Sequence, residues 1–484
     1  MIQSSFTEKR SVFFRVLSDD QIREIKRAAF EILEKTGAKI LHQEARDMLK
    51  KAGAVVKGEA VKIPEYVVQE CIRTAPKGMT IYDRNKKRAL EVEGRKSYYG
   101  TSTASPKTRD ALTGEVHETR VLDIQRGALV ADALPNIDWV MPMGSSQDVP
   151  GFAADLYEFE AVVTHTTKPI VFIGYSKRGF ELVYEMAAEV AGGLDELRAH
   201  PFLIAYPEPI TPLVFPIEVV DRIFIAADLG MPQIPGPSQQ MGATAPVTLA
   251  GAVALGVAEG LLCLTLAQLR RTGTPCFLGA NVSGFDMSTT RMTIAAPEMS
   301  LGLAAQAEVA QSFGLPSWGL AGATDSKVLD AQAGIESAFS ILAQGLGGLN
   351  LIHDVGYMDG GMICSAEMLV MGNEAVGMAK RFIRGIEVNQ ETLAREVIQN
   401  VGPGGNFIQQ EHTFRHFRNE LWRPALMSRH SYEVWRQRGA KDMGMRVREK
   451  VKEILDTHKV PPLPDKTLAA LEKLRRAGEK ALAV

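Results

Sequence analysis

The sequence predicts a large α/β protein built on a (β/α)8 TIM barrel, with helical additions before and after it. From residue 97 onwards, short apolar runs alternate with long helices that have an apolar face. Each run ends in polar residues, as at 349–361, where Leu-Asn-Leu-Ile gives way to His353, Asp354 and Tyr357. No glycine-rich phosphate turn follows the first run, which disfavours the alternative architecture, a doubly wound open sheet.

The barrel is expected over residues 97–386 and is formed by eight strand and helix pairs. The predicted strands are Ser97–Gly100, Ile137–Pro142, Ile170–Gly174, Phe202–Ala205, Pro232–Pro235, Pro275–Gly279, Ser317–Ala321 and Leu349–His353. The predicted helices are Leu122–Leu134, Ala154–Thr164, Gly179–Val190, Ile217–Leu229, Val247–Arg271, Glu298–Phe313, Val328–Gly345 and Ala366–Ile386.

Residues 1–96 predict an α-rich extension with one hairpin. Ser18 and Gln21 have the spacing of a capping box and begin a first helix that Gly37 ends. A second helix follows His42 and a third begins at Pro64. Residues 79–82 and 90–92 are expected to pair as the hairpin.

Residues 387–484 predict a helical C-terminal extension. A stiff proline-rich spacer at 460–464 precedes a last amphipathic helix with Leu468, Leu471 and Leu474 on one side. Such a helix is expected to dock on its own domain or on a second subunit, and we predict a homo-oligomer.

Composition excludes several classes of function. The chain has 484 residues, 55 Lys and Arg, 57 Asp and Glu, and a net charge of −2, so no nucleic acid partner is expected. Four scattered cysteines show no zinc spacing, and no metal site or nucleotide site is predicted. The first ten residues lack the apolar core of an export signal, which favours the cytoplasm. The apolar stretch 243–269 contains Glu259 and is predicted to be a buried barrel helix rather than a membrane span.

The loops after the predicted strands carry the candidate site. Since the carboxyl ends of parallel barrel strands meet at one mouth, aromatic residues there can form a cage for a quaternary ammonium ion. The candidate aromatic residues are Tyr98, Tyr99, Tyr206, Phe285 and Tyr357. For any one of them, simple packing at the barrel rim is the alternative.

Polar groups complete the candidate site. His353 is the candidate catalytic residue because it ends a strand beside Asp354, although a structural, hydrogen-bonded histidine is the alternative. Gln239, Asn281 and Asp325 follow other strands and are candidate substrate-binding residues. Lys327 could suggest a Schiff-base lysine, but it is expected in a loop that starts a helix, where a solvated lysine is commoner.

Four stretches resemble the trimethylamine:corrinoid methyltransferase superfamily: 17–37, 98–105, Ala-Gly-Ala-Thr-Asp-Ser-Lys-Val-Leu-Asp-Ala-Gln-Ala-Gly-Ile-Glu at 321–336, and Val-Gly-Pro-Gly-Gly-Asn-Phe-Ile-Gln-Gln-Glu-His at 401–412. The resemblance extends over almost the whole chain. It is to the branch without pyrrolysine, typified by glycine betaine:corrinoid methyltransferase, because the sequence contains no pyrrolysine. The position equivalent to that residue is expected within 330–334.

The resemblance implies an enzyme that moves a methyl group from a quaternary amine, glycine betaine above all, to Co(I) of a corrinoid. The acceptor would be cob(I)alamin carried by a small corrinoid protein. Two other functions stay open: a TIM-barrel lyase or aldolase that uses Lys327, and a non-catalytic binder of quaternary amines.

Overall fold

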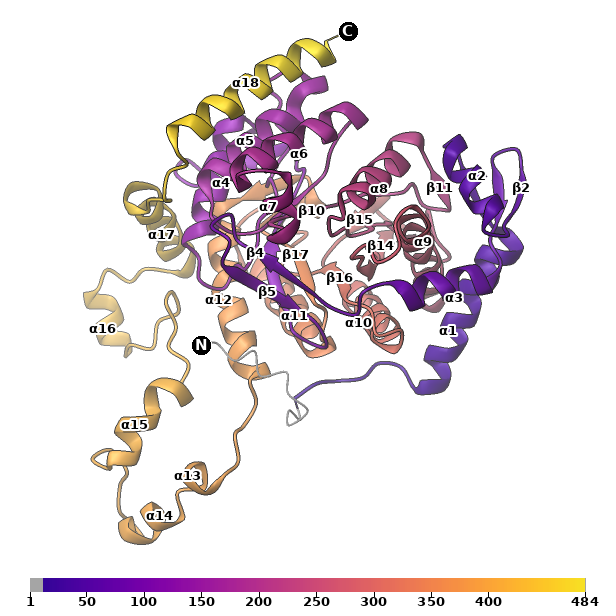
Figure 1. The fold of residues 1–484 in the computed structure, drawn as a ribbon. Coiled ribbons are helices and arrows are strands. Elements are labelled where there is room, and N and C mark those ends of the chain that lie inside the picture. The colour runs from indigo at the N-terminus through magenta and orange to yellow at the C-terminus, as the bar shows by residue number, and fades with distance from the viewer. Residues whose placement is uncertain (1–11, 484) are drawn as a thin grey trace.

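The computed structural model describes residues 12–483 (Figure 1). Six short parallel strands form its centre: β6 (Tyr98–Thr101), β9 (Ile170–Phe172), β10 (Leu203–Ala205), β13 (Leu278–Gly279), β16 (Ser317–Leu320) and β17 (Leu351–Val355). One sheet has the order β13-β16-β17-β6, and β9 pairs with β10. β17 therefore lies inside a sheet, between β16 and β6.

Single parallel bridges join these sheets through the two remaining predicted strands. Gly100 pairs with Trp139 and Val140 with Ile170, while Gln233 pairs with both Ala205 and Cys276. Both segments are too short to count as strands. At 232–235 the physical reason is clear, because the prolines at both ends have no N–H to donate to a ladder.

The eight predicted helices are present, with ends that differ by a few residues. They are α4 (Val121–Ala133), α5 (Ala154–His165), α6 (Lys177–Ala191), α8 (Ile217–Leu229), α9 (Leu249–Arg270), α10 (Pro297–Ser312), α11 (Ala331–Gly347) and α12 (Ala366–Ile383); a short α7 (Leu194–Ala199) was not predicted. By length and hydropathy α9 could cross a membrane, but 83% of its apolar window is buried inside the protein. Its contacts are those of a core helix.

The interior of the strand layer is one buried cluster. All eight segments contribute to it, through Tyr98, Trp139, Met141, Val171, Ile204, Tyr206, Ile234, Phe277, Trp318 and Leu351. The predicted hairpin, β4 (Met79–Tyr82) with β5 (Arg88–Val92), adds Ile81, Leu90 and Val92 to this cluster. The backbone N–H of Tyr82 donates to the carbonyl of Pro201, just before β10, so the hairpin covers the amino ends of the strands.

The N-terminal helices begin where the sequence predicts. α1 (Asp19–Glu31) has the capping box of Ser18 and Gln21, α2 (Gln43–Lys51) follows His42, and α3 (Glu65–Thr74) follows Pro64. A turn of π-helix extends α1 to Thr36.

Sequence analysis missed three short strands, β1 (Ala38–Ile40), β2 (Val55–Lys57) and β3 (Ala60–Lys62), which form a sheet with β11 (Val214–Phe215). Strands of three residues, partly exposed, carry too little apolar periodicity to be recognised.

Small sheets that the sequence did not reveal also cover the carboxyl ends of the strands. One has the order β18-β19-β7-β8, from β18 (Tyr357–Met358), β19 (Ile363–Ser365), β7 (Lys107–Arg109) and β8 (Val116–Glu118). The other combines β12 (Gln240–Met241), β14 (Ser283–Asp286) and β15 (Arg291–Thr293).

The C-terminal extension has a packed part and an exposed part. α17 (Met443–Thr457) packs on α4 and α12, and α18 (Asp465–Leu482) packs on α5 and α6 with Leu471 buried (Figure 1). The last helix thus docks on its own chain. Residues 387–421, which we call the arm, contain α13 (Gln390–Leu393), α14 (Arg395–Val401) and α15 (Glu411–Glu420) and no buried residue. In Figure 1 the arm extends away from the body of the molecule, and α16 (Tyr432–Gln437) follows it in the chain.

Candidate functional site

His353 and Asp354 lie at the carboxyl end of β17 and are almost completely buried. The pairing of β17 with β6 shifts register between Ile352 and Val355, so the strand bulges here. Asp354 has a φ of 86°, which is costly for a residue other than glycine. A bulge changes the direction in which side chains point, and this bulge includes His353, the candidate catalytic residue.

Aromatic rings surround His353. Trp318, in β16, stacks on the imidazole with ring centroids 4.3 Å apart and planes 25° apart. Tyr206, which follows β10, lies 6.1 Å from the imidazole and 5.3 Å from the Trp318 ring. Residues from β16, from the end of β17 and from the loop after β10 therefore bring three rings together.

Asn281 and Tyr206 belong to the same group. The side-chain amide of Asn281 donates to the Tyr206 hydroxyl at 2.8 Å. Burial raises the pKa of Tyr206 well above its ordinary value, and the negative charge of Glu208 acts in the same direction. Tyr206 is therefore a neutral hydrogen-bonding ring in this site.

Negative charge collects beside these rings. Burial raises the pKa of Glu208 to about 7, with Arg222 opposing the shift and Asp354 adding to it. Arg222 is buried and donates to the carbonyl of Gly174 at 2.7 Å. Glu208 and Asp354 thus place two carboxyl groups in this region, and within residues 12–483 Arg222 is the basic side chain whose charge lowers the pKa of Glu208. An ionised pair leaves a net negative charge, which favours a bound cation.

Several buried polar atoms of this group make no hydrogen bond within residues 12–483. They are both ring nitrogens of His353, Oδ1 of Asp354 and Oδ1 of Asn281. Nδ1 of His353 lies 2.8 Å from Oδ1 of Asp354, without hydrogen-bond alignment. A buried polar atom without a partner costs about 1–3 kcal/mol, so such atoms gathered in one place indicate a site for a ligand or for water.

Tyr357 joins the cluster from β18. Its hydroxyl donates to the carbonyl of Thr103, which fixes the ring above the end of β17. Burial raises the pKa of Tyr357 well above its ordinary value, and the charge of Asp354 contributes. Of the five predicted cage aromatics, Tyr206 thus lies beside His353, and Tyr357 lies near Asp354 and Tyr206.

The other three aromatics lie elsewhere. Tyr98 and Tyr99 were predicted to follow a strand, which is wrong because they form the beginning of β6. The Tyr98 hydroxyl bonds to the backbone of Glu91 in the hairpin, and the Tyr99 hydroxyl donates to the carbonyl of Ile341 in α11. Phe285 lies in β14 opposite Met292 and is half-buried in the rim sheet.

Gln239 is directed away from His353. Its side-chain amide donates to Glu259 in α9, which also accepts from Thr211 and from the backbone of Leu213. This network satisfies a carboxylate inside an apolar helix layer. Gln239 therefore has a structural partner, and its Oε1 alone is without one among residues 12–483.

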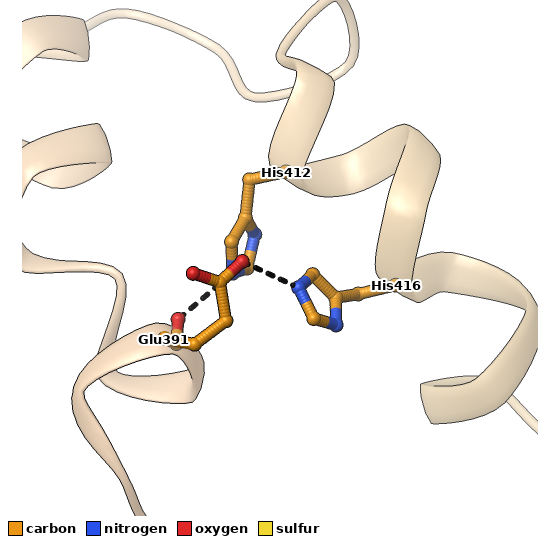
Figure 2. Close-up of side chains that lie close together, drawn as sticks. All are labelled: Glu391, His412 and His416. Carbon is orange, nitrogen blue, oxygen red and sulfur yellow. Dashed lines mark hydrogen bonds and ion pairs between the residues drawn. The ribbon is translucent and has the colours of Figure 1, made fainter.

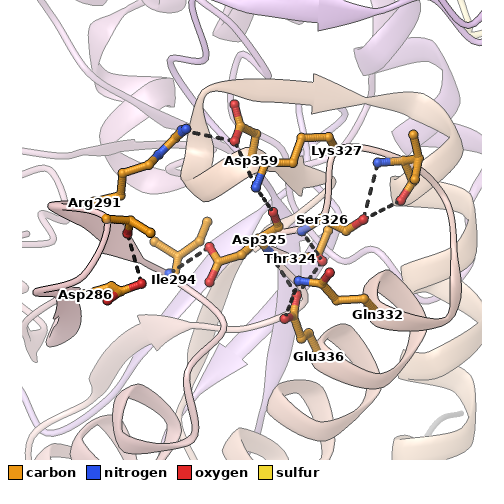
Figure 3. A network of polar contacts seen from close by, with 12 residues as sticks. Asp286, Arg291, Ile294, Thr324, Asp325, Ser326, Lys327, Gln332, Glu336 and Asp359 are labelled. Atoms are coloured by element: carbon orange, nitrogen blue, oxygen red, sulfur yellow. Dashed lines mark hydrogen bonds and ion pairs between the residues drawn. The ribbon is translucent and has the colours of Figure 1, made fainter.

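Asp325 belongs to a second polar network, on the loop after β16 (Figure 3). It accepts from the backbone of Ile294 at 3.2 Å, and burial raises its pKa, helped by the charge of Glu336. Lys327 is exposed, donates to the Asp325 carbonyl at 2.7 Å and lies 3.4 Å from Asp359. An exposed lysine paired with a carboxylate lacks the desolvation that activates a Schiff-base lysine.

Residues 330–334 begin α11. The Asp330 carboxylate accepts from the backbone of Ala333 as the N-cap of that helix, and a Cβ at Gly334 would meet open space. Their equivalence to pyrrolysine stays a prediction.

Sequence analysis missed Trp318, Glu208, Arg222 and Asp354 as members of the site. Trp318 is hidden inside an apolar strand, and Arg222 inside the helix α8, where neither residue type is unusual. Glu208 and Asp354 stand beside selected residues, Tyr206 and His353, and a search for paired carboxyls after strands would have found them.

Comparison with known proteins identifies the family. The profile of the trimethylamine methyltransferase (MTTB) family matches residues 2–480. The chain belongs to the MTTB family. It belongs to the branch without pyrrolysine, since the sequence has none.

Among MTTB family relatives, the chain is 33% identical to trimethylamine methyltransferase MttB of Desulfitobacterium hafniense strain DSM 10664 / DCB-2, over 98% of this chain and 96% of that one. It is 29% identical to glycine betaine methyltransferase of D. hafniense strain Y51, over 87% and 88%. Among solved structures, the Methanosarcina barkeri monomethylamine methyltransferase (MtmB) covers 91% of this chain and 93% of its own with 13% identity and a TM-score of 0.49.

Proposed function

We propose that this MTTB family methyltransferase moves a methyl group from a quaternary amine, with glycine betaine as the first substrate to test, to Co(I) of a corrinoid. We also propose that the eight strand segments close into a (β/α)8 barrel over residues 97–386, followed by the helical extension 387–484 and preceded by the extension 1–96. The uninterrupted series of parallel pairings and the shared interior cluster support the closed barrel.

One observation carries the function: aromatic rings and carboxyl groups converge on the buried end of β17. Tyr206 and Tyr357 would offer ring faces, Trp318 holds the His353 imidazole by stacking on it, and Asp354 and Glu208 offer negative charge. Ring faces attract a quaternary ammonium ion by about 0.5–2 kcal/mol each, most strongly where water is excluded. A carboxylate nearby adds to the attraction, because the charge of the substrate is fixed.

His353 would orient the substrate. Its ring nitrogens have no hydrogen-bond partner within residues 12–483, so a protonated nitrogen is free to donate to the carboxylate of glycine betaine. Asn281 positions Tyr206 by its hydrogen bond to the hydroxyl. The two ends of a betaine would thereby be recognised by different groups.

Demethylation of a quaternary amine requires little acid or base catalysis from the protein. When the bond from methyl carbon to nitrogen breaks, its electron pair stays on nitrogen and a neutral amine leaves, so no proton has to be supplied. The corrinoid supplies a Co(I) nucleophile that accepts the methyl group. The residues of this chain bind the cation, exclude water and hold one methyl group in line, which is catalysis by positioning.

The methyl acceptor would be carried by a separate small corrinoid protein that docks at the carboxyl ends of the strands. The cluster around His353 lies at that end, and the amino ends are covered by the hairpin β4-β5. The proposal includes a cytoplasmic homo-oligomer.

A second candidate substrate is a quaternary amine without a carboxylate. The excess of carboxyl groups favours it, because Asp354 and Glu208 would repel the acid group of a betaine. A lyase or aldolase using Lys327 has less support, given the exposure of that lysine. A non-catalytic binder of quaternary amines would differ from both enzymes because it would form no product.

Methylation of added cob(I)alamin, followed by its absorbance change, tests the proposal. With glycine betaine we expect methylcobalamin and dimethylglycine in equal amounts. Tetramethylammonium as the better substrate would favour the second candidate. Tight binding of either amine without any methylcobalamin, with the corrinoid protein present as well, would refute the enzymatic function.

A further inference from the structure

We propose that Glu391, His412 and His416 form a metal site of the zinc class in the arm, a site independent of the proposed reaction. His412 and His416 are four residues apart on α15, so their side chains lie on one face of the helix. Glu391 reaches them from α13 (Figure 2). One ligand atom of each residue lies within 4.8 Å of the other two.

The distance between one pair of proposed ligand atoms is already close to that found around a bound ion, whereas His412 contacts the backbone of Glu391. Nε2 of His416 lies 3.0 Å from Oε1 of Glu391, and Nε2 of His412 lies 3.2 Å from the Glu391 carbonyl. In a tetrahedral zinc site with bonds of about 2.0–2.1 Å, neighbouring ligand atoms are about 3.3 Å apart. A small rotation of the Glu391 side chain and the His412 ring would place three ligands around one ion.

The donor set determines which ions fit. Two imidazoles and one carboxylate suit Zn²⁺ or Co²⁺, with water in the fourth position. Mg²⁺ and Ca²⁺ prefer oxygen ligands only. Two histidines at positions i and i+4 of a helix are also a recurring arrangement of zinc ligands.

A metal ion bound in the arm would have a structural role. No residue of the arm is buried, and Ile408 and Phe414 are 83% and 71% exposed. Its far end is tied to α12 through Glu420, which pairs with Arg381 and Arg384. The near end of the arm follows α12 directly in the chain. Between the two ends, the contact of Glu391 with His412 and His416 connects α13 to α15. A segment without a core commonly depends on a metal ion or another cross-link for its order.

Metal analysis of the full-length, tag-free protein tests the site. After dialysis against a chelator, addition of Zn²⁺ and desalting, we expect about one zinc per chain. Co²⁺ in its place should give the visible absorption of a tetrahedral site. The same protein, compared with and without zinc, should show slower amide hydrogen exchange in α13 and α15 when zinc is bound.

Two variants and one control decide the assignment. His416→Ala and Glu391→Gln should lose zinc retention, the second with the fold of the arm least disturbed. His430→Ala, an exposed histidine outside the cluster, should retain zinc as the wild type does. Wild type that retains no zinc, or His416→Ala that retains as much as wild type, would overturn the proposal and leave an ordinary ion pair between His416 and Glu391.

Discussion

The cluster around His353 and the arm are stabilised in opposite ways. His353, Asp354 and Tyr206 are at most 4% exposed, and their positions are fixed by packing from several strands. The arm has no buried residue and is held by contacts between charged and polar side chains. In the cluster, packing fixes buried polar atoms that lack partners, whereas in the arm exposed polar contacts determine the position of a whole segment.

Trp318→Ala is expected to have the largest effect. Its ring is 1% exposed and packs on His353, Trp139 and Tyr206, so its removal should lower the free energy of unfolding by about 3–5 kcal/mol. Phe414→Ala in the arm is the matched control and should cost less than about 0.5 kcal/mol. Urea unfolding followed by circular dichroism compares them, and similar midpoints for the two variants would contradict the contrast.

His353→Ala is expected to lower methyl transfer to cob(I)alamin about 10- to 100-fold, because the substrate loses its orienting hydrogen bond. The fold should persist, since neither ring nitrogen has a hydrogen-bond partner within residues 12–483. Single-turnover rates with saturating glycine betaine measure the effect. A full rate would make His353 a packing residue, and His412→Ala, in the arm, serves as the control for a histidine outside the cluster.

Glu208→Gln tests the negative charge of the cluster. Burial raises the pKa of Glu208 to about 7, so its carboxyl group is neutral below that pH and ionised above it. Wild-type affinity for tetramethylammonium should therefore rise as the pH increases from 6 to 8.5, by about tenfold. The variant should bind as the wild type does at low pH, with little pH dependence. Calorimetric titration provides the affinities, and an unchanged pH profile in Glu208→Gln would assign the titration to another group.

Tyr357→Leu tests the ring face alone. Removing one aromatic face from a desolvated cation should weaken binding by about 1–2 kcal/mol. Glycine betaine and 3,3-dimethylbutanoate have nearly the same shape, but only the first carries a quaternary nitrogen. The variant should lose affinity for the betaine and little for the carbon analogue. Equal losses for both ligands would show that Tyr357 contributes packing only.

The sequence allowed the prediction of the parallel α/β core because each strand and helix there is long or apolar enough to show its period. The capping box at Ser18 and the hairpin β4-β5 were predictable from local chemistry. The rim sheets and β1 to β3 were not, because most of these short strands contain exposed residues and lack the continuous apolar run of core strands such as β9 and β10.

The site was predicted in part for a related reason. His353, Tyr206 and Asn281 follow strands and lie close together, with Tyr357 near Asp354, while their roles in a site stay a prediction. Tyr98 and Tyr99 do not reach the cluster because they lie inside the strand, which runs over 98–101 where 97–100 was predicted, and not in the loop after it. Trp318 was missed because its neighbours in sequence are apolar, and only the packing of three strands shows which ring faces the histidine.

Lys327→Ala is expected to have the smallest effect, less than twofold on methyl transfer. Lys327 lies on the loop network of Figure 3 and not in the cluster around His353, and its contacts are an exposed ion pair with Asp359 and a hydrogen bond to the Asp325 carbonyl. Exposed pairs of this kind contribute about 0–1 kcal/mol to stability. Borohydride treatment in the presence of a carbonyl compound should alkylate Lys327 no more than the other exposed lysines, because a solvated lysine is mostly protonated and is not activated for Schiff-base formation. A reduced adduct at Lys327, together with loss of activity in the variant, would move the chemistry from the strand ends to this loop.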